Sequence, residues 1–137
     1  MAFRFRYVWN GQAEPLVRKW PTDATNIQRG DLLVLSGGKA AKAAPGATGI
    51  LGVAQDAPSN GQVTVIVSHD AVFEVPYPGT TKTSLADADL GTAFDINTDA
   101  ASINLDDTLD GMCQVVDYDN DRKVAYVLVK NRALALQ

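Results

Sequence analysis

The fold is decided by residues 29–69, RGDLLVLSGGKAAKAAPGATGILGVAQDAPSNGQVTVIVSH. Three short apolar runs lie within this stretch, at Leu32–Leu35, Ile50–Ala54 and Val63–Val67. Because each run is rich in Val, Ile and Leu and is flanked by turn-forming residues, the runs indicate buried strands rather than helices. Asn60-Gly61 accepts the positive φ angles of a type I′ turn. We therefore expect Ile50–Gln55 and Gln62–Ser68 to form a β-hairpin.

Residues 91–130 resemble this stretch more weakly. Three pairs of segments match. Gly30–Leu35 matches Gly91–Ile96, and Gly49–Val53 matches Gly111–Val115. Asn60-Gly61 followed by Val63–Val67 matches Asn120-Asp121 followed by Val124–Val129. Two copies about 60 residues apart do not make a solenoid. Two interpretations stay open: an internal two-fold β-repeat, or a chance likeness between two three-stranded stretches.

The composition is that of one globular domain. The chain has 137 residues, of which 46% are apolar, and no apolar run approaches the length of a membrane span. The first ten residues, MAFRFRYVWN, lack the continuous apolar core and small-residue cleavage site of a signal peptide. The single cysteine, Cys113, lies in an alternating strand pattern, which favours a small buried apolar side chain over a reactive thiol.

Charge is distributed unevenly along the chain, whose formal net charge is −4. Residues 1–42 carry a balance of +4, residues 43–121 a balance of −12, and residues 122–137 a balance of +4. Basic ends and an acidic middle suit electrostatic complementarity between copies of the chain, or with a protein partner. The basic residues are dispersed and the pI is near 4.7, which disfavours a nucleic-acid-binding surface.

The N-terminus alternates between aromatic and basic residues. The pattern predicts a strand over residues 2–9 with two faces, one of Phe3, Phe5, Tyr7 and Trp9 and the other of Arg4 and Arg6. This strand either covers its own core or forms an arm that docks on a neighbouring subunit or partner, because Tyr, Trp and Arg are enriched at interface hot spots. We divide the chain into an N-terminal arm and connection (1–28), a β-domain (29–130) and a C-terminal tail (131–137).

The remaining segments complete an all-β fold. Residues 10–28 indicate an extended connection, and residues 37–48 a loop or a short edge strand. A strand is expected at Val72–Val75, and the only helical turn at 84–90. Further strands are expected at 92–96, 102–105, 111–118 and 123–130. Short strands with regular turn signals predict a compact β-sandwich or barrel-like domain.

We find no catalytic set in the sequence. A His/Cys zinc site needs more ligands than the one histidine and one cysteine present. Ser68, His69 and Asp70 are adjacent in a predicted strand, so their side chains alternate between faces and cannot converge. Lys39 follows Gly-Gly, but it is not followed by Ser or Thr and a helix, as a phosphate-binding loop requires. We expect no enzyme activity, no cofactor and no metal.

Two acidic motifs have simpler structural interpretations. Arg29-Gly30-Asp31 spells a cell-attachment tripeptide, but its position favours a turn that enters a strand. Asp117–Asp121 resembles the start of a calcium loop, yet Arg122 and Leu128 stand where an EF-hand needs Gly and Glu. A solvated hairpin turn is favoured, and a weak cation site stays open. The other acidic residues of this region indicate surface charge for solubility: Asp87, Asp89, Asp95, Asp99, Asp106, Asp107 and Asp110.

Short motifs across about residues 25–130 resemble the head decoration (capsid cement) proteins of tailed bacteriophages. The motifs are Gly30–Leu35, Gly37–Lys39, Ile50–Ala54, Gly61–Val65 and Leu90–Ile96. The resemblance implies a β-rich homotrimer at three-fold or quasi-three-fold positions on the capsid exterior, made in the host cytoplasm. It would clamp neighbouring major capsid proteins after head expansion. Its partners would be the major capsid protein and itself, with no nucleic acid and no membrane.

The arm is the predicted partner-binding site. Its residues are Phe3, Arg4, Phe5, Arg6, Tyr7 and Trp9. An alternative function is a phage tail or host-attachment module that recognises a glycan or a surface protein, which exposed aromatic side chains in loops would favour.

Overall fold

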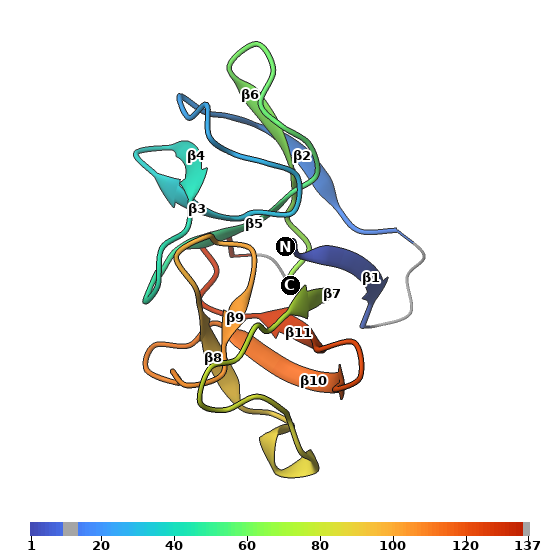
Figure 1. Ribbon diagram of the computed structural model, residues 1–137. Helices are drawn as coiled ribbons and strands as arrows, with labels where there is room; N and C mark the ends of the chain where they lie inside the picture. The colour runs from blue at the N-terminus through green and yellow to red at the C-terminus, as the bar shows by residue number, and fades with distance from the viewer. Residues whose placement is uncertain (10–13, 136–137) are drawn as a thin grey trace.

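The computed structural model describes residues 1–9 and 14–135, and the fold is an all-β sandwich of two packed antiparallel sheets. The six-stranded sheet has the order β1 (Arg4–Val8), β7 (Ala71–Pro76), β11 (Val124–Val129), β10 (Cys113–Asp119), β8 (Ala93–Ile96), β9 (Ile103–Asn104). The five-stranded sheet has the order β2 (Val17–Pro21), β6 (Gln62–Ile66), β5 (Ile50–Ala54), β3 (Leu32–Ser36), β4 (Lys39–Lys42). Figure 1 shows the five-stranded sheet above and the six-stranded sheet below, with β1 beside β7.

The predicted central hairpin is confirmed. β5 and β6 pair antiparallel, and Asn60 and Gly61 have φ angles of 53° and 73°. Ser59 and Gln62 exchange backbone hydrogen bonds of 2.8 and 3.1 Å across this two-residue turn. The positive φ angles explain why Asn-Gly stands here, because other residues would be strained in the same turn.

The internal repeat is present in the topology. The first unit (β2–β6) has the order β2-β6-β5-β3-β4, and the second unit (β7–β11) has the same order, β7-β11-β10-β8-β9. Equivalent backbone hydrogen bonds occur within the two units. In the first, the Gly30 N–H donates to the Ala54 carbonyl at 2.8 Å, and in the second, the Gly91 N–H donates to the Val115 carbonyl at 2.7 Å. The two units are therefore copies of one five-stranded plan.

One alignment within the repeat differs from the sequence match. Leu33 pairs with Gly52 in the first unit and Phe94 pairs with Cys113 in the second. The counterpart of Gly52 is therefore Cys113, one position before the match predicted. The match aligned Gly49 with Gly111 by identity. The turn before the strand instead needs a positive φ, which is 70° at Gly49 and 54° at Asp110.

Two apolar clusters stabilise the units. The larger cluster joins side chains of both sheets, including Leu32 and Ile50 of the first unit and Phe73 and Val127 of the second. The smaller cluster includes Leu33, Leu51, Val63 and Val65 of the first unit, with Ile27 from the segment before β3 and Leu134 of the tail packed against it. The central strand β5 is thus buried along its whole length, whereas the edge strand β2 keeps exposed residues.

A β-bulge interrupts the alternation of the N-terminal strand. The register between β1 and β7 shifts between Phe5 and Tyr7, so Phe3 and Val8 are each 2% exposed. Tyr7 is 45% exposed and Trp9 57% exposed. The prediction of one continuous aromatic face is therefore wrong beyond Phe5, because the extra residue reverses the side-chain direction. The burial of Phe3 shows that the N-terminal strand covers the core of its own chain.

Residues 10–28 differ from expectation, and the described part of the tail pairs with the first unit. Residues 10–28 include a strand, β2, that pairs with β6 along its whole length, whereas the sequence suggested only a connection. Residues 10–13, also part of that expectation, lie outside the described residues. In the tail, Ile50 donates to Asn131 at 2.7 Å and Ala133 donates to Ile50 at 2.8 Å, so these residues pair with β5 of the same chain.

The other local predictions agree with the structure. Residues 39–42 form the short edge strand β4, and the helical turn is a 3₁₀ helix, η1 (Asp87–Asp89). The Ala86 N–H, at the start of this turn, donates to the Asp89 carboxylate at 2.9 Å. Across residues 1–9 and 14–135, no helix is long and apolar enough to cross a membrane.

Candidate functional site

A groove of ≈ 750 Å³ lies beside β1 and contacts both sheets. It is lined by Ala2, Phe3, Arg4, Phe5, Arg6, Pro15, Arg29, Gly30, Val53, Ala54, Gln55, Ile66, Glu74 and Arg122. The Phe3 N–H donates to the Gly30 carbonyl at 2.8 Å, which holds the start of the chain against the first unit. Gly30 permits this approach, because a Cβ there would lie 2.5 Å from Cβ of Ala2.

The groove is cationic in an acidic protein. Among the described residues, four arginines line it, and Glu74 is the only acidic residue that does. The arginines are Arg4, Arg6, Arg29 and Arg122. The chain as a whole carries −4, so this is a local reversal of charge. A surface of this kind attracts an anionic or acidic partner over distances of about 10 Å at moderate ionic strength.

Cross-strand pairing places charged and aromatic side chains in one row. Arg4 pairs with Glu74, and Glu74 pairs with Tyr126, so the three lie on the same face of the six-stranded sheet. Arg122 donates to both carboxylate oxygens of Glu74 at 3.1 Å, and Arg6 lies 5.9 Å from the centre of the Tyr126 ring. These hydrogen bonds from Arg122 to Glu74 hold the guanidinium in position, and they raise the pKa of Arg122.

The predicted partner-binding residues divide into two groups. Phe3, Arg4, Phe5 and Arg6 line the groove, and Phe3 and Phe5 also contact Phe73 edge-on, each at a centroid distance of 6.4 Å. The other two, Tyr7 and Trp9, are exposed at the end of β1 and beyond it. The predicted set is therefore contiguous along one strand, but part of it is core.

Sequence reasoning missed the groove residues that come from distant segments. Arg29 precedes β3, Glu74 lies in β7 and Arg122 lies in the turn before β11. The available signal was the excess of basic residues at both ends of the chain. That excess predicted complementarity with a partner without indicating which basic residues meet.

Residues 68–70 have structural contacts at the junction of the two units. Ser68 is 7% exposed, and its hydroxyl accepts the N–H of Leu16, the residue that precedes β2. The Asp70 carbonyl accepts the N–H of Trp9 at 2.7 Å. Cys113 is fully buried, as expected, and burial raises the pKa of its thiol, with a smaller contribution from Asp95.

The two acidic motifs form turns. Asp31 is 3% exposed, accepts the Gln28 N–H at 2.8 Å and lies 3.4 Å from Nζ of Lys42, so Arg29-Gly30-Asp31 enters a strand as expected. Asp119 accepts the N–H groups of Asp121 and Arg122 at 3.1 and 3.3 Å within the β10–β11 turn. In the part of the chain that the structure describes, no three His, Cys, Asp or Glu side chains are grouped to hold a metal ion.

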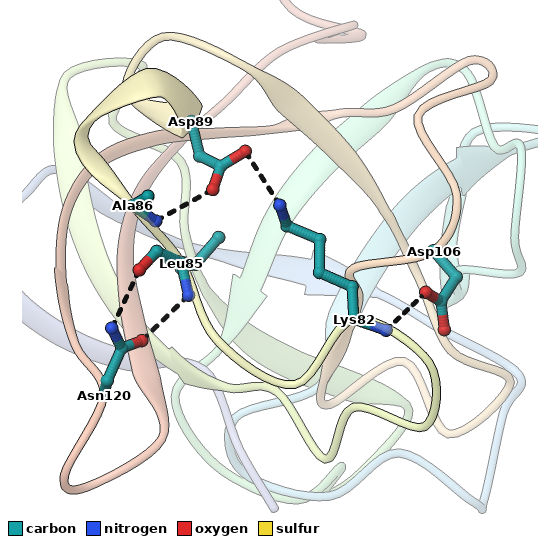
Figure 2. A network of polar contacts seen from close by, with 6 residues as sticks. All are labelled: Lys82, Leu85, Ala86, Asp89, Asp106 and Asn120. Carbon is teal, nitrogen blue, oxygen red and sulfur yellow. Dashed lines mark hydrogen bonds and ion pairs between the residues drawn. The ribbon is translucent and has the colours of Figure 1, made fainter.

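Several acidic side chains organise loops in addition to solvating the surface. Figure 2 shows Asp106 accepting the Lys82 N–H at 2.8 Å, Lys82 paired with Asp89 at 3.1 Å, and the Asn120 side chain bound to Leu85. Backbone hydrogen bonds lower the pKa of Asp106, from Lys82 first and then Thr81. The Ala86 N–H likewise lowers the pKa of Asp89. The prediction of surface charge for solubility was incomplete for these residues and wrong for Asp95, which is 2% exposed in β8 and accepts the Gly46 N–H at 2.7 Å.

Comparison with known proteins gives no relative. No family model matches the chain, no curated protein matches it, and no solved structure matches it.

Proposed function

We propose that this protein is a non-enzymatic capsid decoration (cement) protein that binds the outer surface of a phage head and stabilises contacts between major capsid proteins, as a trimer. The observation that carries the proposal is the surface along β1, where a groove with four arginines adjoins exposed Tyr7 and Trp9. Arg, Tyr and Trp dominate the binding energy of protein interfaces when they cluster. The sequence motifs that resemble decoration proteins supply the identity of the partner.

A clamp of this kind acts mechanically. It adds interface area that must be broken before neighbouring capsid subunits separate, so the head withstands internal pressure for longer. The rigid support of β1 suits this role, because its pairing with β7 and the burial of Phe3 and Val8 fix the strand before any partner binds. A preordered surface loses less conformational entropy on binding than a flexible arm.

The test is co-sedimentation with expanded heads that lack their decoration protein. Wild-type protein should bind saturably, at a ratio set by the three-fold sites. Trp9→Ala should weaken binding about 30-fold, the loss typical of an interface hot spot. Leu90→Ala is the matched control, because Leu90 is 46% exposed and lies far from β1 in the strand order. Its binding should equal that of the wild type.

Point substitution is a sharper test than deletion of residues 1–9. Deletion removes Phe3 and Val8 from the core, so lost binding could follow from lost folding. Full binding by Trp9→Ala and Tyr7→Ala would refute these residues as the contact, and the absence of saturable binding by the wild type would refute the capsid function.

Exposed Trp9 also supports a second candidate, a host-attachment module that binds a glycan. A side chain 57% exposed offers a stacking surface for a sugar ring. Binding on a glycan array, lost in Trp9→Ala and accompanied by no binding to heads, would favour this function over the first.

A further inference from the structure

The loop at residues 106–110, DDTLD, presents an apolar side chain among acidic residues. Leu109 is 76% exposed, more than any other large apolar side chain in the described residues. Asp106 and Asp110 flank it and are also exposed. An exposed leucine of this kind costs free energy in water, and its burial in a partner recovers that free energy.

The loop is held in shape from its base. Asp106 accepts the N–H groups of Lys82 and Thr81 at 2.8 and 3.3 Å, and it accepts the Thr80 hydroxyl at 3.1 Å (Figure 2 shows the bond to Lys82). Asp107 accepts the N–H of Leu109 at 2.9 Å. A loop fixed in this way loses little conformational entropy when it docks.

The groove beside β1 has complementary chemistry. Three of its four arginines, Arg4, Arg6 and Arg29, are in no ion pair within the described residues, and Arg122 is paired with Glu74. Phe5 and Pro15 supply apolar lining for a leucine. Arg29, at its rim, is exposed and has none of its side-chain donors in a hydrogen bond or ion pair recorded within the described residues. A guanidinium of this kind can bind a carboxylate through two parallel hydrogen bonds.

The loop lies at the opposite edge of the six-stranded sheet from this groove. β1 is one edge strand of that sheet, and β9, which directly precedes the loop, is the other. The two surfaces therefore meet only between different molecules. A contact between unlike surfaces of identical chains repeats head to tail, and it closes into a ring when the rotation allows.

We propose that the loop 106–110 of one copy docks into the groove of the next copy, with Leu109 entering the apolar part and Asp110 pairing with Arg29. This contact would build the trimer of the proposed function and rests on that part of it. Under this proposal the arginines of the groove serve self-association, and of the surface along β1 only Tyr7 and Trp9 contact the capsid.

The test is sedimentation equilibrium of the full chain in solution, without heads. The wild type should self-associate, and high salt should weaken the association because the contact includes charge pairs. Leu109→Ser and Asp110→Asn should each weaken association about tenfold, and so should Arg29→Gln. Asn tolerates the positive φ of 54° at position 110, so this variant keeps the loop conformation.

Matched controls separate this contact from general effects of charge and polarity. Asp121→Asn, Leu90→Ser and Arg18→Gln make the same chemical changes at exposed positions outside the proposed contact, and they should leave association unchanged. The double variant Arg29→Gln with Asp110→Asn should lose less than the sum of the two single losses, because both remove one interaction. Thermal melts of every variant verify folding.

The outcomes distinguish the two proposals. Self-association that depends on these residues, with no binding to heads, supports the contact and refutes the capsid function. A monomeric wild type, or equal effects of variants and controls, overturns the contact. Binding of a single-stranded oligonucleotide by a monomeric protein, lost in Arg29→Gln, also overturns it and assigns the groove to nucleic acid.

Discussion

The first and second units share one strand order but differ in what covers them. The first unit, β2–β6, has its own apolar cluster on one face and packs on the second unit with the other. The second unit, β7–β11, has an extra edge strand, because β1 pairs with β7. The proposed contacts lie on the second unit: β1, which has no counterpart in the repeat, at one edge, and the loop after β9, which corresponds to the loop after β4, at the other. One candidate surface is thus an addition to the repeat, and the other is a repeated loop with a different sequence.

One pair of equivalent positions shows the role of β1. Arg18 pairs with Val65 in the first unit, and Phe73 pairs with Val127 at the same place in the second. Arg18 is exposed at the edge of its sheet, whereas Phe73 is fully buried in the cluster between the sheets, with Phe3 and Phe5 edge-on to it. The same position of the repeat is thus on the surface in the first unit and in the core in the second, where β1 pairs along the strand edge that β2 leaves open.

The largest expected effect breaks this pair. Phe73→Ala should lower the free energy of unfolding by about 4 kcal/mol, because it leaves a cavity beneath β1. Arg18→Ala should change it by about 0.5 kcal/mol or less. Urea unfolding followed by tryptophan fluorescence measures both. Similar losses at the two positions would contradict the difference in covering.

A smaller effect concerns Gly52 and its counterpart Cys113. A Cβ at position 52 would lie 2.0 Å from the Ile66 carbonyl oxygen, so Gly52→Ala must displace backbone. We expect a loss of about 3 kcal/mol in unfolding free energy. Cys113→Ala only removes a buried sulfur and should cost about 1 kcal/mol. The same urea titration compares them, and a tolerated alanine at position 52 would show that the strands of the first unit can separate slightly.

The smallest effect separates the units by pH. A neutral contact of the first unit, the Thr22 hydroxyl donating to the Ala40 carbonyl at 2.7 Å, can be compared with a charged contact of the second, where the Asp106 carboxylate accepts the Lys82 N–H at 2.8 Å. The pKa of Asp106 is lowered by folding, so its contribution is complete above the unfolded value of about 4 and is lost as the pH falls through the folded pKa.

Hydrogen exchange measures this difference directly. Protection of the Lys82 amide should fall several-fold between pH 6 and about pH 3, after correction for the intrinsic exchange rate, while the Thr22 amide, bound to the Gly61 carbonyl, keeps its protection. In Asp106→Asn the pH dependence at Lys82 should disappear. An equal fall at both amides would indicate global acid unfolding instead.

Local chemistry explains what could be predicted from the sequence. Asn60-Gly61 specifies a turn with two positive φ angles, and the apolar runs beside it are too short for helices, so the hairpin and the all-β class follow from neighbouring residues. The repeat was visible because turn residues recur with nearly equal spacing. Its alignment slipped by one position because Asp110 adopts the positive φ that glycine signals more plainly.

Long-range pairing explains what could not be predicted. β2 carries Arg18 and Lys19 at its centre, and it becomes a strand only because β6 supplies its hydrogen bonds. The bulge in β1 is set by the register with β7, which the sequence of β1 alone does not contain. The groove likewise assembles residues from segments far apart in the chain, so the sequence indicated its charge but not its members.

The segment before the first unit pairs with the second unit, and the segment after the second unit pairs with the first. β1 precedes the first unit in sequence but pairs with the second, and Asn131–Ala133 follow the second unit but pair with β5 of the first. During synthesis the first unit therefore leaves the ribosome before residues 131–133, which bond to β5, have been made. β1 has no strand to pair with until β7 has been synthesised. The first unit cannot be completed before residues 131–133 have been synthesised, so its folding depends on contacts between residues that are distant in sequence. A nascent chain halted before residue 131 should accordingly expose the backbone of Ile50, the first residue of β5, to chaperones and to other nascent copies.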